Sequence, residues 1–167
     1  MTSPTYYLDV FKALNDAGAR YIVVGGIAVG LHGIPRNTFD LDIMIDLEQR
    51  NILTINHALS HLGYVPRVPV NPEDFADETT RNEWVAKKNM LVFSWWKSSE
   101  QYRIIDIVFH HPFDFDACYS RRVERHDDAI NIPLIEINDL IAMKRFANRK
   151  QDLSDIEALE QVKRIYG

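Results

Sequence analysis

The feature that most constrains the fold is a short apolar run, residues 21–24, which ends in two adjacent glycines, Gly25 and Gly26. The run has the pattern of a buried strand, and residues 26–33 read as a small-residue helix that ends at a glycine before Ile-Pro. Glycines at such a junction let a ligand approach the backbone closely, and the helix offers free N–H groups and a positive dipole end to a phosphate. The alternative explanation is tight packing of the strand against the helix.

Strand and helix patterns alternate along the rest of the chain and predict an α/β (α+β) fold. We expect helices near residues 10–18, 26–33, 52–63, 78–88, 136–148 and 152–165, and strands near 21–25, 41–46, 90–96, 102–109, 121–125 and 129–134. Three prolines within residues 64–77 predict an irregular segment or a sheet edge. The sequence therefore predicts a small mixed β-sheet with helices packed against it and a helical C-terminus.

Composition limits the class of protein. A chain of 167 residues can bury one core, and we expect a single domain over residues 1–167, with a core at about 21–110 and a helical part at about 136–167. A net charge of −5 disfavours a protein that coats nucleic acid. The single cysteine, Cys118, cannot form an internal disulfide, and no apolar stretch reaches the length of a bilayer span. We expect a soluble, cytoplasmic protein with no membrane partner.

Two carboxylates lie at the start of the second predicted strand. Asp40 and Asp42 are two residues apart, so both project from one face, while Leu41 and Ile43 project from the other. Two such carboxylates repel each other unless a cation lies between them, and Mg²⁺ prefers carboxylate, phosphate and water oxygens. The alternative is a solvated acidic strand start.

A third carboxylate, Asp106, lies within the apolar run 104–109. Burying it without a partner would cost several kcal/mol. Its partner is either a backbone or arginine hydrogen bond, or a metal ion shared with Asp40 and Asp42. Three carboxylates from two strands are what a two-metal phosphoryl-transfer centre needs.

Cations gather near the C-terminus. Lys144 continues the inward stripe of a predicted helix, so its ammonium group needs an anion, either a carboxylate or a bound phosphate. Arg149 suits bidentate phosphate contact, and Arg36, close in sequence to the glycines and aspartates, is a candidate phosphate or nucleotide contact. Asp152 either caps the last helix or takes part in catalysis, and Asp155 lies in the first turn of that helix.

The segment Gly25-Gly26-Ile-Ala28 … His32-Gly33-Ile-Pro-Arg36-Asn-Thr38-Phe-Asp40-Leu-Asp42, with Asp106 as third carboxylate, resembles the signature of the DNA polymerase β-like nucleotidyltransferase superfamily. Residues 144–155 look like the late motifs of its AbiEii/MenA-type toxin branch. The chain departs from the usual Gly-Ser motif, because Gly26 replaces the serine whose hydroxyl contacts phosphate.

The resemblance implies a metal-dependent enzyme that moves an NMP unit from an NTP to a hydroxyl group of RNA, protein or a small molecule. It implies a toxin of a toxin–antitoxin pair, with an antitoxin protein as partner. It implies that Asp40, Asp42 and Asp106 catalyse the reaction and bind Mg²⁺ (or Mn²⁺). It implies that the nucleotide is bound by Gly25, Gly26, Arg36, Thr38, Lys144 and Arg149. The alternative is a catalytically silent module that binds a nucleotide or a partner. A glycosyltransferase that uses Asp-x-Asp accounts for neither the glycines nor Asp106.

Overall fold

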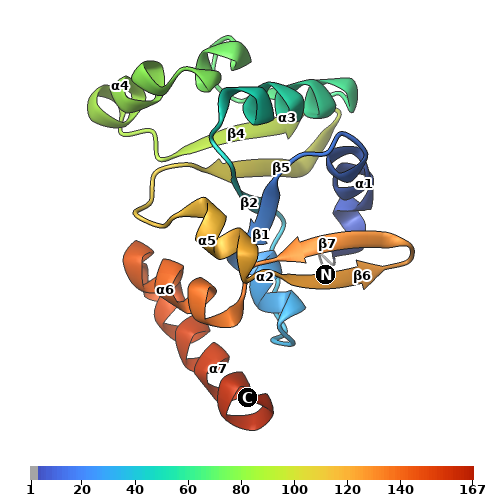
Figure 1. Ribbon diagram of the computed structural model, residues 1–167, viewed down its shortest axis with the longest axis vertical. Coiled ribbons are helices and arrows are strands. Elements are labelled where there is room, and N and C mark those ends of the chain that lie inside the picture. Colours follow the sequence, from blue (N-terminus) through green and yellow to red (C-terminus); the bar gives the residue numbers. More distant parts are fainter. Residues whose placement is uncertain (1–3) are drawn as a thin grey trace.

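A computed structural model describes residues 4–167 and contains a mixed sheet flanked by helices (Figure 1). The strands are β1 (Tyr21–Val24), β2 (Leu41–Ile45), β3 (Val65–Pro66), β4 (Val92–Lys97), β5 (Glu100–Val108), β6 (Val123–Asp127) and β7 (Ile130–Leu134). The helices are α1 (Leu8–Asp16), α2 (Gly25–Leu31), α3 (Gln49–His61), α4 (Glu78–Lys88), α5 (Phe115–Ser120), α6 (Ile137–Ala147) and α7 (Lys150–Tyr166), with short 3₁₀ turns at Pro4–Tyr7 and Pro72–Ala76. The predicted mixed α/β class is confirmed.

The strand order across the seven-stranded sheet is β3-β4-β5-β2-β1-β7-β6. The pairs β2–β5 and β1–β7 are parallel, and the other neighbours are antiparallel. Strand β1, which carries the apolar run before the glycine pair, therefore lies between β2 and β7. This arrangement places the start of α2 beside the first residues of β2.

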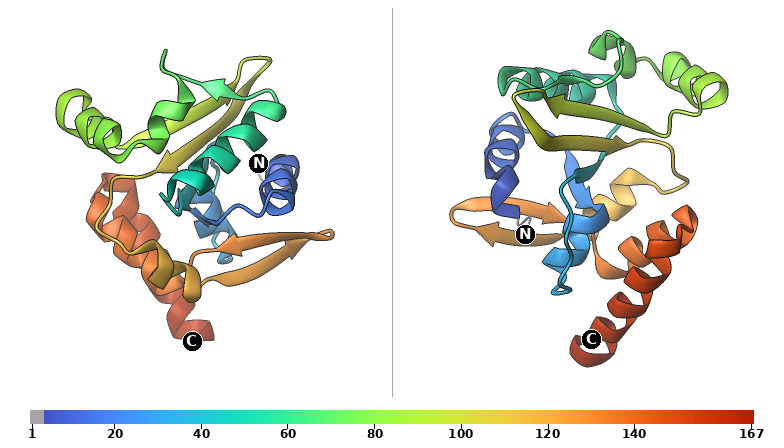
Figure 2. Two further views of the ribbon diagram at one scale, coloured as in Figure 1. Left: turned by 45° about the horizontal axis from the view of Figure 1, so that its top comes forward. Right: turned by 180° about the vertical axis from the view of Figure 1, so that it is seen from behind.

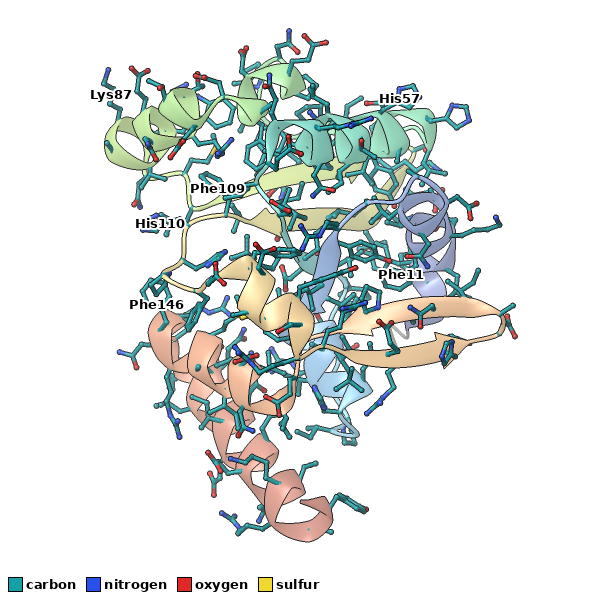
Figure 3. All side chains as sticks on the ribbon, in the orientation of Figure 1. Phe11, His57, Lys87, Phe109, His110 and Phe146 are labelled. Atoms are coloured by element: carbon teal, nitrogen blue, oxygen red, sulfur yellow. The ribbon has the colours of Figure 1, made fainter. Side chains whose placement is uncertain are left out.

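Alternating side chains divide the sheet into a buried and a more open face. On β4, Phe93 and Trp95 are fully buried, and Phe93 stacks on Phe75 at 4.7 Å and on Trp84 of α4 at 5.7 Å between ring centroids. Helices α1, α3 and α4 lie on one side of the molecule and the α6–α7 hairpin on the opposite side (Figure 2). Phe11 of α1 is buried, whereas His57 of α3 and Lys87 of α4 lie at the outer surface (Figure 3).

Several elements differ from the predictions at their ends. Helix α2 begins at Gly25, one residue earlier than expected, and the strand expected at 121–125 is found at Val123–Asp127. Helix α5 was not predicted, because it has only six residues and little apolar periodicity. The segment 64–77 contributes the two-residue edge strand β3, as its prolines indicate. None of the helices in the described part of the chain is both long and apolar enough to cross a membrane.

Candidate active site

The register of β2 and β5 brings two of the three predicted carboxylates together. Asp42 of β2 is the direct neighbour of Asp106 on the parallel strand β5, and Leu41 and Ile43 are paired in the same way with Ile105 and Ile107. The isoleucines and leucine are fully buried on the opposite face, so the alternation of each strand directs both carboxylates to the more open face. Parallel strands lie about 4.8 Å apart, which makes the two groups close neighbours.

Gly25 makes room for the Asp42 side chain. Its φ angle is +68°, and a Cβ atom there would lie 2.0 Å from Oδ2 of Asp42. Any other residue would therefore meet backbone strain and a direct clash. The second glycine, Gly26, is buried, and a Cβ atom there would lie 3.0 Å from Oγ1 of Thr38. The two glycines thus let the start of α2 pack against Asp42 and Thr38, two of the predicted site residues.

Burial and mutual repulsion perturb the carboxylates. Burial, then the charges of Asp106 and Asp40, raises the pKa of Asp42 to about 7, although the positive charges of Arg149 and Lys144 oppose the shift. Burial and the charge of Asp106 also raise the pKa of Asp40, which Arg67 partly offsets. At neutral pH, this group of acids therefore favours either a proton or a cation.

Two residues that the sequence did not single out position the carboxylates. Ser94 of β4 is the register partner of Asp106, and its hydroxyl group donates a hydrogen bond to Oδ1 of that residue. The hydroxyl group of Tyr7 donates to the carbonyl oxygen of Phe39, next to Asp40, and accepts from the backbone N–H of Ile104 at 3.3 Å. Ser94 could have been predicted, because it shares a face of the predicted hairpin with Asp106. Tyr7 could be predicted as a core residue only, and it is fully buried.

Lys144 lies in a buried ionic cluster at the base of the α6–α7 hairpin. Its side chain is 4% exposed, and Nζ donates to Oδ1 of Asp152 at 3.2 Å. Nζ also lies 2.9 Å from Oδ2 of Asp155, but the angles there are not those of a hydrogen bond, so this contact is electrostatic only. The required anion is therefore supplied by Asp152 and Asp155, and the predicted phosphate contact of Lys144 stays a prediction.

Arginines from two segments complete this cluster. Arg36, in the loop before β2, forms an ion pair with Oδ1 of Asp155. The Arg149 guanidinium donates to Asp152, whose carboxylate also accepts from the Arg149 backbone N–H and so caps α7. Burial opposes the ionisation of Asp152, but these hydrogen bonds and Lys144 outweigh it and lower its pKa. Helix α7 begins two residues earlier than predicted, so Arg149 is its N-cap, and Asp152 takes part in the cap from the third helical position. The cluster connects α7 to the loop that carries Thr38 and Asp40.

The donor chemistry fits a divalent cation, although the ligands are not preassembled. Asp42 and Asp106 offer carboxylate oxygens, and the raised pKa of Asp42 reflects its burial and then the negative charges of Asp106 and Asp40. Within residues 4–167, however, no three His, Cys, Asp or Glu side chains are close enough together to hold a metal ion. The register brings Asp42 and Asp106 together, and Asp40 is not gathered with them as a ready metal ligand. The binding of a metal ion by all three carboxylates stays a prediction.

Comparison with known proteins places this geometry in context. Residues 8–166 match the profile of a family described as "Nucleotidyltransferase of unknown function (DUF6036)". No curated protein sequence matches the chain.

Three solved structures share the fold. The lincosamide antibiotic adenylyltransferase LnuA, in its lincomycin-bound form, has a TM-score of 0.61 at 18% identity, over 95% of this chain and 94% of that one. ANT(2")-Ia, in complex with adenylyl-2"-tobramycin, has a TM-score of 0.58 at 10% identity, over 95% and 91%. An antigenic nucleotidyltransferase-like protein from Paracoccidioides brasiliensis has a TM-score of 0.56 at 16% identity, over 93% and 73%.

Proposed function

The chain belongs to the DUF6036 family of nucleotidyltransferases and is such an enzyme, and on this premise we propose that it transfers an NMP unit from an NTP to a hydroxyl group of an acceptor. In this reaction, the acceptor oxygen bonds to the α-phosphorus, the bond to the bridging oxygen breaks and pyrophosphate leaves. The observation that carries the proposal is the pairing of Asp42 with Asp106 beside the glycine pair. Such catalysis needs positioned charge more than covalent chemistry from the protein.

We assign roles to the residues on the open face of the sheet. Asp40, Asp42 and Asp106 would hold Mg²⁺ or Mn²⁺, which when bound neutralises the charge of the phosphates and the developing negative charge. Asp106, oriented by Ser94, accepts the proton of the acceptor hydroxyl group. Asp42 is held against Gly25 in a fixed position.

The remaining predicted residues would contact the nucleotide. Gly25 and Gly26 would face it through the backbone, and Arg36, Thr38 and Arg149 would surround its phosphates, with Lys144 behind them. Of these, Arg149 is the most accessible cation, since its side chain is 62% exposed although it donates to Asp152. Lys144 acts instead through charge and through the position of Asp152 and Asp155, because its ammonium group is buried between them.

For the acceptor we favour a small molecule over RNA or protein. Two structural neighbours are bound to an antibiotic or to its adenylylated product, and each covers more than nine-tenths of this chain. A toxin function with an antitoxin partner rests on residues 144–155 alone and stays a prediction. The alternative of a silent binding module has no specific observation in its favour.

Transfer of label from α-³²P-labelled NTPs tests the proposal. Each of the four NTPs is incubated with Mg²⁺ or Mn²⁺ and with small hydroxylated compounds, total RNA or protein extract. We expect labelled product from the parent and from Asp128→Asn, which changes an exposed carboxylate of the β6–β7 turn. Asp42→Asn and Asp106→Asn should lower the rate by at least about 100-fold, because each removes charge from the reacting centre. Undiminished transfer by either variant would refute the assigned roles.

A further inference from the structure

A cavity of about 270 Å³ adjoins Ser94, the residue whose hydroxyl group donates to Asp106. Its lining consists of three apolar side chains, one hydroxyl group and one guanidinium: Val68, Met90, Val92, Ser94 and Arg67. A cavity of this size holds a small molecule or one part of a larger one. It is distinct from the glycine turn, because β4 and β1, after which that turn follows, lie on opposite sides of the carboxylate strands β5 and β2 in the sheet order.

The register of β4 and β5 places the cavity wall on the carboxylate side of the sheet. Val92 and Ser94 are two residues apart on β4 and share a face, whereas Phe93 between them is fully buried on the other. Their neighbours on β5 are Val108 and Asp106. The Asp106 carboxylate therefore lies on the same face of the hairpin as Val92, beside Ser94.

Arg67 supplies the charge of the cavity. Its backbone N–H donates to the carbonyl oxygen of Ser94 at 2.9 Å, which fixes the segment after β3 along β4. The guanidinium carbon lies 5.9 Å from the centroid of the Trp96 ring, and the residue is exposed. Among the ion pairs of the described residues, none includes Arg67. The charge of Arg67 acts on Asp40 from a distance. Its guanidinium forms no ion pair, lies beside an apolar wall and is suited to a planar anionic group.

We propose that this cavity binds the acceptor, and that the acceptor is a small molecule with an apolar body, a hydroxyl group and an anionic group. This inference rests on the proposed function. The apolar body packs on Val68, Met90 and Val92, the anionic group binds Arg67, and the hydroxyl group reaches Asp106. The acceptor oxygen then forms its bond to the α-phosphorus, its proton passes to Asp106, and pyrophosphate departs with the electrons of the broken bond. Polyamine acceptors are disfavoured, because the described lining has a guanidinium and no carboxylate.

Three matched compounds test the chemistry of the acceptor: 8-hydroxyoctanoate, 1,8-octanediol and 8-amino-1-octanol. They share an aliphatic chain and a terminal hydroxyl group and differ in charge at the other end. Binding to the full chain is measured by tryptophan fluorescence, since Trp96 lies beside Arg67, and transfer is measured with α-³²P-labelled NTP. We expect the hydroxy acid to bind and react about tenfold better than the diol, which corresponds to about 1.4 kcal/mol, and the amine to be the poorest.

Variants at Arg67 separate this inference from the proposed function. Arg67→Gln should abolish the preference for the hydroxy acid and Arg67→Glu should invert it toward the amine. The three compounds are compared within each variant at saturating NTP and Mg²⁺, because the charge of Arg67 also acts on Asp40. Arg164→Gln, which removes an exposed arginine of α7, should retain the parent preference. A preference that persists in Arg67→Gln, equal use of the three compounds by the parent, or binding of none of them overturns the inference, even where label reaches another acceptor. Arg67-dependent binding without label transfer to any acceptor contradicts the proposed function instead.

Discussion

At the scale of single residues, the site depends on the contact between Gly25 and Asp42. The carboxylate occupies the space in which any other residue would carry Cβ, and the positive φ angle adds a second requirement for glycine. The two requirements can be separated, because Gly18 also has a positive φ angle, of +71°, but has no atom within 4 Å of the position of its missing Cβ. Gly18 is therefore a matched reference for Gly25.

We expect Gly18→Ala to destabilise the fold by about 1 kcal/mol, the cost of a left-handed alanine, without effect on turnover. Gly25→Ala should lower the free energy of unfolding by more than this, because the new Cβ atom also displaces Asp42. It should also lower the rate of label transfer by at least about 100-fold. Urea unfolding and the transfer assay measure the two effects. Equal rates in the two variants would show that Asp42 does not need its position against Gly25.

The raised pKa of Asp42 predicts a pH dependence of stability. The folded pKa of about 7 exceeds the unfolded value of about 3.9, so the folded state binds more protons between these values. The contribution of Asp42 to the stability of the metal-free protein should therefore be fully present at low pH and should be lost as the pH rises through 7. Urea unfolding in EDTA should give a free energy of unfolding lower by roughly 1 to 3 kcal/mol at pH 8 than at pH 5 from this group.

Asp42→Asn should remove this part of the pH dependence of the free energy of unfolding, and Asp128→Asn should retain it. Saturating Mg²⁺ should restore stability at pH 8, because a bound cation takes the place of the proton. If the parent and Asp42→Asn respond equally to pH, the carboxylate of Asp42 is not the group that binds the proton.

At the scale of elements, the α6–α7 hairpin is joined to the sheet through the ionic cluster around Lys144. Lys144 and Asp152 are 4% and 0% exposed, so removing the ammonium group takes away the cation that the two buried carboxylates share and leaves each with one arginine. Breaking a buried pair in this way costs about 3 to 5 kcal/mol. The matched exposed pair on the same hairpin is Arg145 with Glu160, whose nitrogen and oxygen lie 3.2 Å apart.

Lys144→Ala should therefore destabilise the protein by about 3 to 5 kcal/mol, and Arg145→Ala by no more than about 1 kcal/mol. Chemical unfolding followed by circular dichroism measures both. This result would revise the role that we expected for Lys144, because the variant would affect stability before it affected nucleotide binding. A loss of NTP affinity at unchanged stability would instead assign Lys144 to direct phosphate contact.

The C-terminal end of α6 also contacts the segment that follows β5. Phe146 is 52% exposed, its ring packs edge-on against Phe113 at 6.0 Å, and it lies on the same side of the molecule as His110 (Figure 3). The hairpin thus contacts the segment after β5 through an aromatic pair and the loop before β2 through charge.

At the scale of the whole molecule, a nucleotide bound with its cation should stabilise the entire fold. The site draws residues from β2, β5 and the loop before β2, and all of these are held together in the folded state only. At a ligand concentration 100 times Kd, the gain is about 2.7 kcal/mol, or roughly 5 to 10 °C in Tm for a chain of this length. Thermal scans with each NTP should show this rise with Mg²⁺ and lose it in EDTA or in Asp42→Asn. A rise that survives both changes would place the nucleotide elsewhere.

The predictable parts of this molecule are those that depend on local patterns. The helix at 78–88 and the hairpin of β4 and β5 follow directly from periodicity and turn residues, and the need of Lys144 for an anion follows from its place on an apolar stripe. The identity of that anion could not be predicted, because it depends on how α7 folds back on α6. The same holds for the space at Gly25, which is filled by a residue 17 positions later in the chain through strand pairing.

The pairing of Arg36 with Asp155 also sets an order of events during synthesis. The two residues are 119 positions apart, and a ribosome adds about 5 to 20 residues per second. Roughly 6 to 24 seconds therefore pass between the emergence of the loop that carries Asp40 and the arrival of the carboxylate that secures it. Until then the nascent chain has the glycine turn and the acidic pair but lacks the anchor of that loop. The loop that carries Asp40 is therefore anchored only after Asp155 has been synthesised.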